Sequence, residues 1–239
     1  MQGLIRCLVP FIAEKLHVTE PTLPVVPIDP IDDLPHREEP SLVEQWQFDF
    51  WSPEHDLGGW THFTYDQSSR KGWYVTVLVG VDRQIVLVVD PKIQIPQLTQ
   101  YLEFRAEGIW AQHVCETPLE HWTVGLEAFG VTLETAEDAM GNQWGKRTGV
   151  GLDLEWEQID KPESTGSGFS QQCSVTGEVL IDDEVIDLNA QGWRSRSWSS
   201  NLDVIDRPKG NVIRIDVGGI VLNIEPNFSG QQWNGCLSR

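Results

Sequence analysis

Apolar and polar residues alternate along most of the chain between residues 46 and 225. In the stretch 102–110, Leu102, Phe104 and Trp110 fall on one face, while Glu103 and Arg105 fall on the other. Similar alternating or continuously apolar runs of strand length occur at 46–51, 59–66, 72–80, 84–90, 121–131, 151–159, 171–181 and 211–225. A period of two residues is typical of strands, and short polar turns between runs favour antiparallel neighbours. The pattern predicts an all-β fold, either an antiparallel barrel or stacked sheets.

Three segments break this alternation. Residues 1–17 contain a short apolar run that Pro10 and Glu14 interrupt, which favours an N-terminal helix or arm over a signal peptide. Proline is frequent in residues 18–41, and we expect this segment to be an extended arm lying over a domain surface. Further along, Thr135 and Gly141 have the spacing of the cap residues of a short helix.

The composition limits the expected partners. The 239 residues include 17 Lys and Arg against 36 Asp and Glu, a formal net charge of −19. Such a surface repels phosphate backbones and anionic membranes, so neither nucleic acid nor a membrane is expected. The four cysteines lie far apart without CxxC spacing, which favours free thiols in a reducing compartment. Because no run is long enough to span a bilayer, the sequence predicts a cytoplasmic protein.

Three segments together resemble a known superfamily. They are EHDLGGWTHFTY (54–65) with the following GWYVTVLVG, LEFRAEGIWAQHVCETPLEHWTVGLEAFGV (102–131) and CSVTGEVLIDDEVIDLNAQGWRSRSWS (173–199). They are similar to the AttH-like and carotenoid hydratase-like proteins. The resemblance implies a lipocalin-like β-barrel, a fold shared with the fungal pericyclases called Diels-Alderases, and an apolar cavity that needs neither cofactor nor metal. We expect an arm (1–44), a first β unit (45–160) and a second, truncated β unit packed on it (161–239).

One motif departs from the superfamily pattern. Members carry Gly-x-x-Asp-His-x-Trp-Gly, whose Asp is the proposed proton donor in carotenoid hydratases. The matching run here extends from Gly192 to Ser199, with Ser195 in place of the Asp and Arg196 in place of the His. Because a serine cannot act as an acid at neutral pH, proton chemistry would have to come from another residue.

Aromatic residues are the strongest indication of a ligand site. The chain has eleven tryptophans, and those in or beside strands could line an apolar cavity and stabilise developing positive charge. The alternative is that they only pack the core. The candidate ligand-binding residues are Trp46, Trp60, Trp73, Tyr74, Phe104, Trp122, Trp193 and Trp198.

The candidate catalytic residues are Glu116, Glu120, His62 and Arg196. If its strand already includes it, Glu120 shares a face with Trp122, and a carboxyl beside an apolar cavity would have a raised pKa. The two glutamates could equally brace the hairpin turn or pair with Arg105. His62 could be a hydrogen-bonded wall residue, and Arg196 could bind a ligand carbonyl or pair with surface acids.

A metal site is the alternative interpretation of AQHVCETPLEHW (111–122). It would need His113, Cys115 or Glu116, and His121 to converge on one ion. The turn at Thr117 and Pro118 separates these side chains, and no helical HxxxH or HExxH spacing is present. No metal is therefore expected.

The leading functional hypothesis is a cofactor-free cyclase or isomerase of the pericyclase type. It would act on a hydrophobic polyene, polyketide or terpenoid by holding a reactive conformer, with help from an acid or a polarised carbonyl. A non-catalytic lipocalin-like carrier of such a ligand, and a hydratase or hydrolase of the same superfamily, are the alternatives. A hydrophobic small molecule is the expected partner, and the sequence leaves a homodimer open.

Overall fold

The structure, a computed structural model, confirms the predicted all-β class. It describes residues 27–39, 41–80, 83–95, 101–133, 145–165 and 168–200, and the backbone of three later strands. The predicted helices within 1–17 and at 135–141 lie outside the described residues. Among the residues that are described, no helix has the length and apolar character to cross a membrane. One 3-10 turn, η1 (Pro30–Asp33), precedes the strands.

The strands that follow η1 form one antiparallel sheet. They are β1 (Val43–Ser52), β2 (Leu57–Asp66), β3 (Lys71–Gly80), β4 (Ile85–Gln94), β5 (Tyr101–Ala106), β6 (Ile109–Thr117), β7 (His121–Leu133), β8 (Lys146–Gln158), β9 (Glu163–Ser164), β10 (Gly168–Ile181) and β11 (Glu184–Ser199). Their order is β4-β3-β2-β1-β11-β10-β8-β7-β6-β5, with β9 paired to β10. Because β4 also pairs with β7, eight strands close into a barrel, as the lipocalin-like resemblance predicts.

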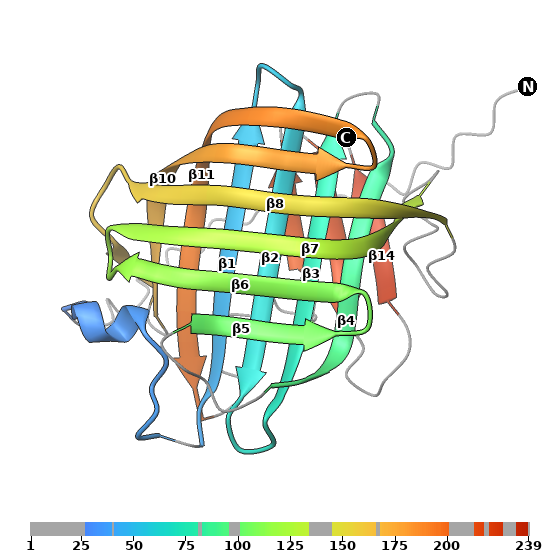
Figure 1. Ribbon diagram of the computed structural model, residues 1–239. Coiled ribbons are helices and arrows are strands. Elements are labelled where there is room, and N and C mark those ends of the chain that lie inside the picture. The colour runs from blue at the N-terminus through green and yellow to red at the C-terminus, as the bar shows by residue number, and fades with distance from the viewer. Residues whose placement is uncertain are drawn as a thin grey trace, which may run out of the picture.

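The barrel is flattened into two crossing layers. Figure 1 shows β5 to β8 running across the front of β1 to β4, and β10 and β11 bending between the two layers. These two strands, 14 and 16 residues long, have the length to contribute to both layers. The division expected at residues 160 and 161 therefore falls inside one sheet.

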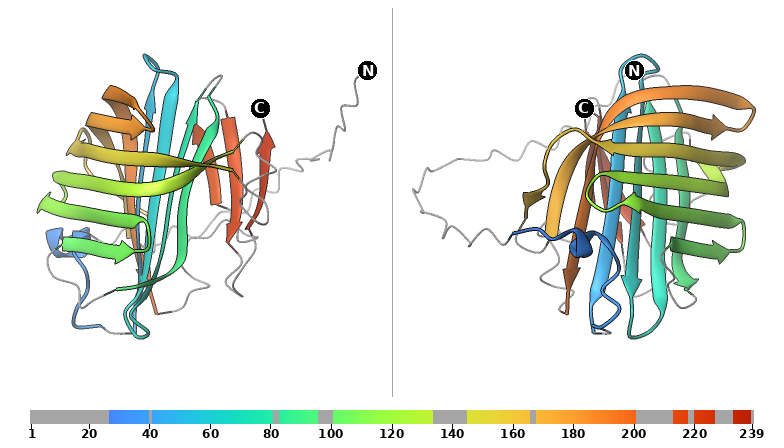
Figure 2. Two further views of the ribbon diagram at one scale, coloured as in Figure 1. Left: turned by 45° about the vertical axis from the view of Figure 1, so that its right-hand side comes forward. Right: turned by 60° about the vertical axis from the view of Figure 1, so that its left-hand side comes forward.

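A separate sheet follows the barrel in the chain. It consists of β12 (Ile213–Val217), β13 (Ile220–Pro226) and β14 (Trp233–Ser238). Figure 2 shows these strands on the side of β1 to β4 that faces away from β5 to β8, and β12 contacts β2.

The barrel interior is a packed aromatic and aliphatic core. Phe48 lies near its centre, with ring centroids 5.6 Å from His113, 5.6 Å from Trp122 and 5.3 Å from Trp156. Each large apolar side chain removed from water in this way contributes about 1.5–3 kcal/mol to folding. The alternation seen in the sequence thus has its origin in one wet and one dry face of each strand of the front layer.

A second cluster explains why residues 72–80 are continuously apolar. Trp60, Trp73, Val75, Val77, Val79, Leu87 and Leu133 pack together apart from the main core. Neighbouring residues on the same strands, such as Tyr74 and Leu78, belong to the interior cluster instead. Strand β3 is therefore buried on both faces, which explains why its sequence has no alternating polar residues.

Residues 27–39, here called the N-terminal strap, are attached to the barrel by the fully buried carboxylate of Asp33. Arg194 on β11 donates to both of its oxygens, at 2.7 and 3.1 Å. The indole N–H of Trp122 and the backbone N–H of Leu119 donate to it as well, at 3.0 and 2.6 Å. Four donors in a dry site satisfy the carboxylate and hold the strap in place.

A second buried ion pair lies two residues along β11. Arg196 donates to Glu44 on β1, and both side chains are fully buried. The guanidinium of Arg196 lies 3.9 Å from the ring centroid of Trp46 and also donates to the Leu34 carbonyl of the strap, at 3.1 Å. Burial alone would raise the pKa of Glu44, but hydrogen bonds from His36 and the charge of Arg196 outweigh burial and lower it.

Replacing Asp33 with alanine is expected to lower the free energy of unfolding by about 3–5 kcal/mol, because it leaves Arg194 charged and unpaired in the core. Urea denaturation followed by tryptophan fluorescence measures this loss. The matched control is Glu103→Ala, which breaks the exposed pair with Arg105 and should cost less than about 1 kcal/mol. Equal costs for the two variants would show that the Asp33 pair does not secure the fold.

Candidate functional site

A groove of about 620 Å³ lies where β1, β10 and β11 pair. Its volume falls within the range of small-molecule sites in proteins, roughly 300–1,000 Å³. Its lining combines two indole rings, a carboxyl and three amides with short apolar stretches. The lining residues are Asp49, Phe50, Trp51, Pro53, Gln172, Asn189, Ala190, Gln191, Gly192 and Trp193.

Strand alternation decides which side chains face the groove. Phe48 and Phe50 of β1 point into the barrel. Since side chains alternate along a strand, Asp49 and Trp51 point outward. Trp193 points outward for the same reason and is 44% exposed. The register places Asp49 opposite Trp193. At the adjacent Gly192, an added Cβ would lie 2.0 Å from the Asp49 carbonyl oxygen, so this close approach of β1 and β11 requires glycine.

Asp49 is the acid of this groove. The backbone N–H of Trp193 donates to its Oδ1 at 3.1 Å. Burial raises the pKa of the Asp49 carboxyl to about 6, although hydrogen bonds from the Trp193 backbone and the Gln47 side chain oppose this. A carboxyl with such a pKa can hold or release a proton close to neutral pH.

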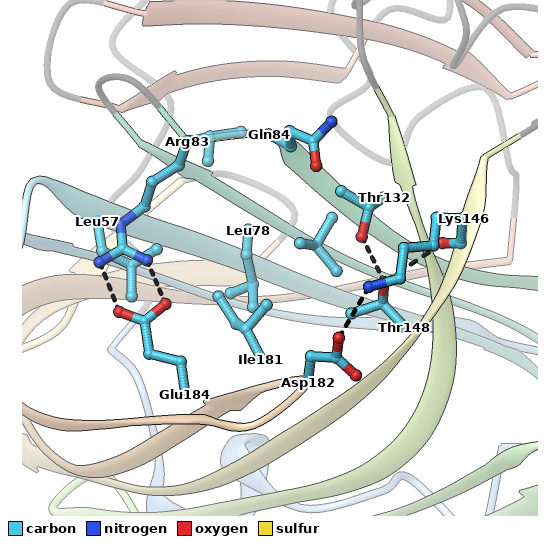
Figure 3. Close-up of a pocket in the computed structure, with 12 residues that line it drawn as sticks. Leu57, Leu78, Arg83, Gln84, Thr132, Lys146, Thr148, Ile181, Asp182 and Glu184 are labelled. Atoms are coloured by element: carbon cyan, nitrogen blue, oxygen red, sulfur yellow. Dashed lines mark hydrogen bonds and ion pairs between the residues drawn. The ribbon is translucent and has the colours of Figure 1, made fainter.

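A smaller pocket of about 210 Å³ lies at one end of the barrel, here called the mouth pocket (Figure 3). Leu57, Leu78, Val86 and Ile181 contribute apolar side chains to it. Two ion pairs border it, Arg83 with Glu184 at 2.8 Å and Lys146 with Asp182 at 2.9 Å. Both carboxylates belong to the hairpin between β10 and β11.

Neither predicted catalytic glutamate faces the apolar interior of the barrel, although Glu120 lines an outer pocket of about 710 Å³ between the strap and the turn that precedes β7. Glu116 is the penultimate residue of β6 and Glu120 lies in the turn before β7, and both are exposed. The backbone N–H of Glu120 donates to Thr117, so the residue belongs to the turn and not to the strand that carries Trp122. The condition for Glu120 to share the apolar face of Trp122, a strand that already includes Glu120, is therefore not met.

The other two predicted catalytic residues lie in separate buried environments. Arg196 is paired with Glu44 inside the barrel, which leaves its charge compensated within the protein. His62 points to the outer side of β2, where its ring lies 5.3 Å from Trp60 and 4.8 Å from Trp73 and Nε2 lies 2.8 Å from the Thr64 hydroxyl. It is a hydrogen-bonded wall residue on the Trp60 face, remote from the interior core.

The predicted ligand-binding aromatics divide among three places. The interior core holds Trp46, Tyr74, Phe104 and Trp122, and the second cluster holds Trp60 and Trp73. Trp198 is half-buried, with its ring 4.7 Å from His36 of the strap. Of these eight residues, only Trp193 lines the groove.

The residues of the 111–122 segment diverge instead of forming a metal site. His113 is fully buried in the core, where burial lowers its pKa to about 3. His121 lies on the wet face beside Glu155, at 2.5 Å. Within the described part of the chain, no three histidine, cysteine or acidic side chains are grouped to hold a metal ion.

Asp49 was not among the residues predicted from the sequence, because its place in the groove depends on how β1 pairs with the distant strand β11. In the sequence, Asp49 is simply one of the polar residues that alternate with the apolar residues of WQFDFW (46–51). Only the pairing of β1 with β11 shows that it lies opposite Trp193, while Gln47 lies opposite Ser195. Asp49 is thus a diagonal neighbour of the position where the superfamily motif has its acid, on the same face of the sheet.

Comparison with known proteins returns solved structures of low sequence identity. A crystal structure of CghA with Sch210972 has 14% identity and a TM-score of 0.37, over 84% of this chain and 58% of that chain. A second CghA structure has 13% identity and a TM-score of 0.34, with the same coverage. This chain therefore spans 58% of the CghA chain.

A protein from Nitrosomonas europaea provisionally named AttH has 14% identity and a TM-score of 0.38, over 91% of this chain and 74% of that one. No curated protein matches the chain. A family profile does match, over residues 29–200, which are most of the chain and include the strap residue Asp33 and all of β1 to β11. The chain belongs to this family, described as "Domain of unknown function (DUF7064)".

Proposed function

We propose that the protein is a cofactor-free cyclase or isomerase of a hydrophobic polyene, polyketide or terpenoid, with the groove as its binding site. The observation that supports this most is Asp49, a carboxyl with a pKa of about 6 in a groove bordered by two tryptophans. The candidate acid thus moves from Glu116 and Glu120 to Asp49, and the candidate aromatic walls become Trp51 and Trp193.

The groove offers two kinds of contact to such a substrate. The indole rings of Trp51 and Trp193 present flat apolar surfaces that would hold an extended carbon chain. The amides of Gln172, Asn189 and Gln191 could bind a carbonyl or hydroxyl at one end of it. Both contacts would limit the substrate to few conformers, which is the main contribution that a cyclase needs.

Asp49 would supply the proton chemistry. With a pKa of about 6, roughly a tenth of the carboxyl is protonated at pH 7. Proton transfer from Asp49 to a substrate double bond or carbonyl would create positive charge, which the faces of Trp51 and Trp193 would stabilise. Loss of a proton from the rearranged cation to the Asp49 carboxylate would complete an isomerisation and restore the acid.

A hydratase is the second candidate, because the same cation could be captured by water instead of losing a proton. The observation that favours it is the position of Asp49 beside the motif in which Ser195 replaces the superfamily acid. For either reaction, we also propose that the protein is cytoplasmic and forms a homodimer.

Asp49→Asn is expected to reduce turnover at least about a hundredfold, because general acid catalysis contributes roughly that much, while ligand binding changes little. Retinol, farnesol and β-ionone serve as probes, with products separated by liquid chromatography and mass spectrometry. An isomerase gives products of unchanged mass, and a hydratase gives products heavier by one water. The matched control is Glu120→Gln, which removes an exposed carboxylate and should retain full activity.

The pH dependence provides a separate readout. Activity should fall as the pH rises through about 6, because Asp49 must be protonated to donate. Binding without any product in the wild-type protein would identify a carrier. Loss of activity in Glu120→Gln but not in Asp49→Asn would reject the proposed acid.

Asp49→Asn should also stabilise the protein at pH 7–8, by about 1–3 kcal/mol, but not at pH 4. The folded-state pKa of about 6 exceeds the ordinary value of 3.8, so between these pH values the folded state binds more protons than the unfolded state. The contribution of Asp49 to stability is therefore fully present below about pH 4 and is lost as the pH rises through about 6. Urea denaturation of both proteins at the two pH values measures the difference, and an equal difference at both would refute the raised pKa.

A further inference from the structure

The mouth pocket differs from the groove in place and in chemistry. Its lining comes from β2, β3, β4, β7, β8 and the hairpin between β10 and β11, and it shares no residue with the groove. Figure 1 places this hairpin at the upper right of the barrel, whereas η1 lies at the lower left. The pocket is therefore at the end of the barrel that the strap leaves uncovered.

The apolar part of the pocket continues the barrel core. Leu57, Leu78 and Val86 are 1%, 1% and 3% exposed and belong to the interior cluster, and the half-buried Ile181 packs against that cluster. An apolar group placed on these four side chains would be removed from water on most sides. A volume of about 210 Å³ equals the liquid volume of roughly seven water molecules, which suits a short alkyl tail.

The polar rim already contains an alkylammonium group, that of Lys146. Figure 3 shows the Lys146 side chain extending over the pocket toward Asp182, beside the hydroxyls of Thr132 and Thr148. The Nζ–Oδ2 distance to Asp182 is 2.9 Å, with side chains 73% and 53% exposed. An ion pair this exposed contributes no more than about 1 kcal/mol, so a ligand could displace Lys146 at little cost.

The charge around the rim favours a cation over an anion. The pocket is lined by two carboxylates, Asp182 and Glu184, and by two basic groups, Lys146 and Arg83, and Asp183 follows Asp182 in the hairpin outside the lining. The chain as a whole has a net charge of −19, which attracts cations to any opening on its surface. The net negative charge of the chain repels a carboxylate ligand and attracts an ammonium.

We propose that the mouth pocket binds a primary alkylamine. The tail would lie on Leu57, Leu78, Val86 and Ile181, and the ammonium would take the place of the Lys146 ammonium next to Asp182. Lys146 then acts as an internal competitor that occupies the head-group position in the absence of ligand. This site is independent of the reaction proposed for the groove.

Three probes with the same tail test the head-group preference, namely octylamine, octanol and octanoate, each titrated into the full-length protein by calorimetry. Octylamine is expected to bind at least about tenfold more tightly than octanoate, with octanol between them. Octanoate binding as tightly as octylamine would overturn the proposal.

Variants of the rim residues test whether the Lys146 ammonium competes with the ligand for the position next to Asp182. Lys146→Met should tighten octylamine binding about threefold to tenfold, because the position next to Asp182 becomes free. Asp182→Asn should weaken it about tenfold, through loss of the charged partner. Lys161→Met, which removes another exposed ammonium outside the mouth pocket, is the matched control and should leave the affinity unchanged. Unchanged or weaker binding by Lys146→Met, with the thermal midpoint retained, would contradict the competitor role.

Two further variants locate the binding site. Ile181→Phe, which fills the pocket from its half-buried side, should abolish octylamine binding without touching the ion pairs. Asp49→Asn should leave octylamine binding unchanged, because Asp49 belongs to the groove. If Asp49→Asn removes the binding instead, the amine is bound in the groove and the assignment to the mouth pocket is wrong.

Discussion

The arrangement of the barrel depends on two guanidinium groups that β11 carries into an apolar interior. Arg194 and Arg196 are 3% and 1% exposed, and an unpaired charge in such a place would cost several kcal/mol. Each has a buried carboxylate as its partner, Asp33 of the strap and Glu44 of β1. The strap therefore lies across the barrel because its carboxylate completes the charge balance of the core, and the core in turn gives an otherwise irregular segment one defined position.

The same two arginines determine where the groove can be. Since residues 194 and 196 point inward, Trp193 and Ser195 must point outward, and a slip of one residue would reverse both sets. The inward Trp46, Phe48 and Phe50 constrain β1 in the same way. Asp49 and Trp193 meet on the outer face because the interior requirements of both strands are satisfied only in this register. The candidate site is thus a consequence of how the core is packed.

The sequence was sufficient for the all-β class, because alternation is local. It was wrong for 102–110, which it took as one strand: a turn between β5 and β6 divides this stretch and leaves Trp110 38% exposed, away from the face of Leu102 and Phe104. It placed His62 on the correct face, beside Trp60 and Thr64. The sequence was insufficient for the site. Asp49 and Trp193 are more than a hundred residues apart along the chain, although they pair in the sheet, and no local pattern indicates this pairing. Glu120 was misplaced because one residue decides whether a turn has ended. The partner of Arg196 was missed because Glu44 looks like any polar residue at the start of a strand.

The two ends of the barrel are held by ion pairs of opposite character. At the strap end the Arg194–Asp33 and Arg196–Glu44 pairs are at most 3% exposed, whereas the two pairs at the mouth are 29–73% exposed. Pairs of the first kind are costly to break because a charge would remain in a dry core, while pairs of the second kind exchange partners with water and ions at little cost. The two arginine pairs thus hold the strap end in one arrangement, whereas the pairs at the mouth can exchange partners.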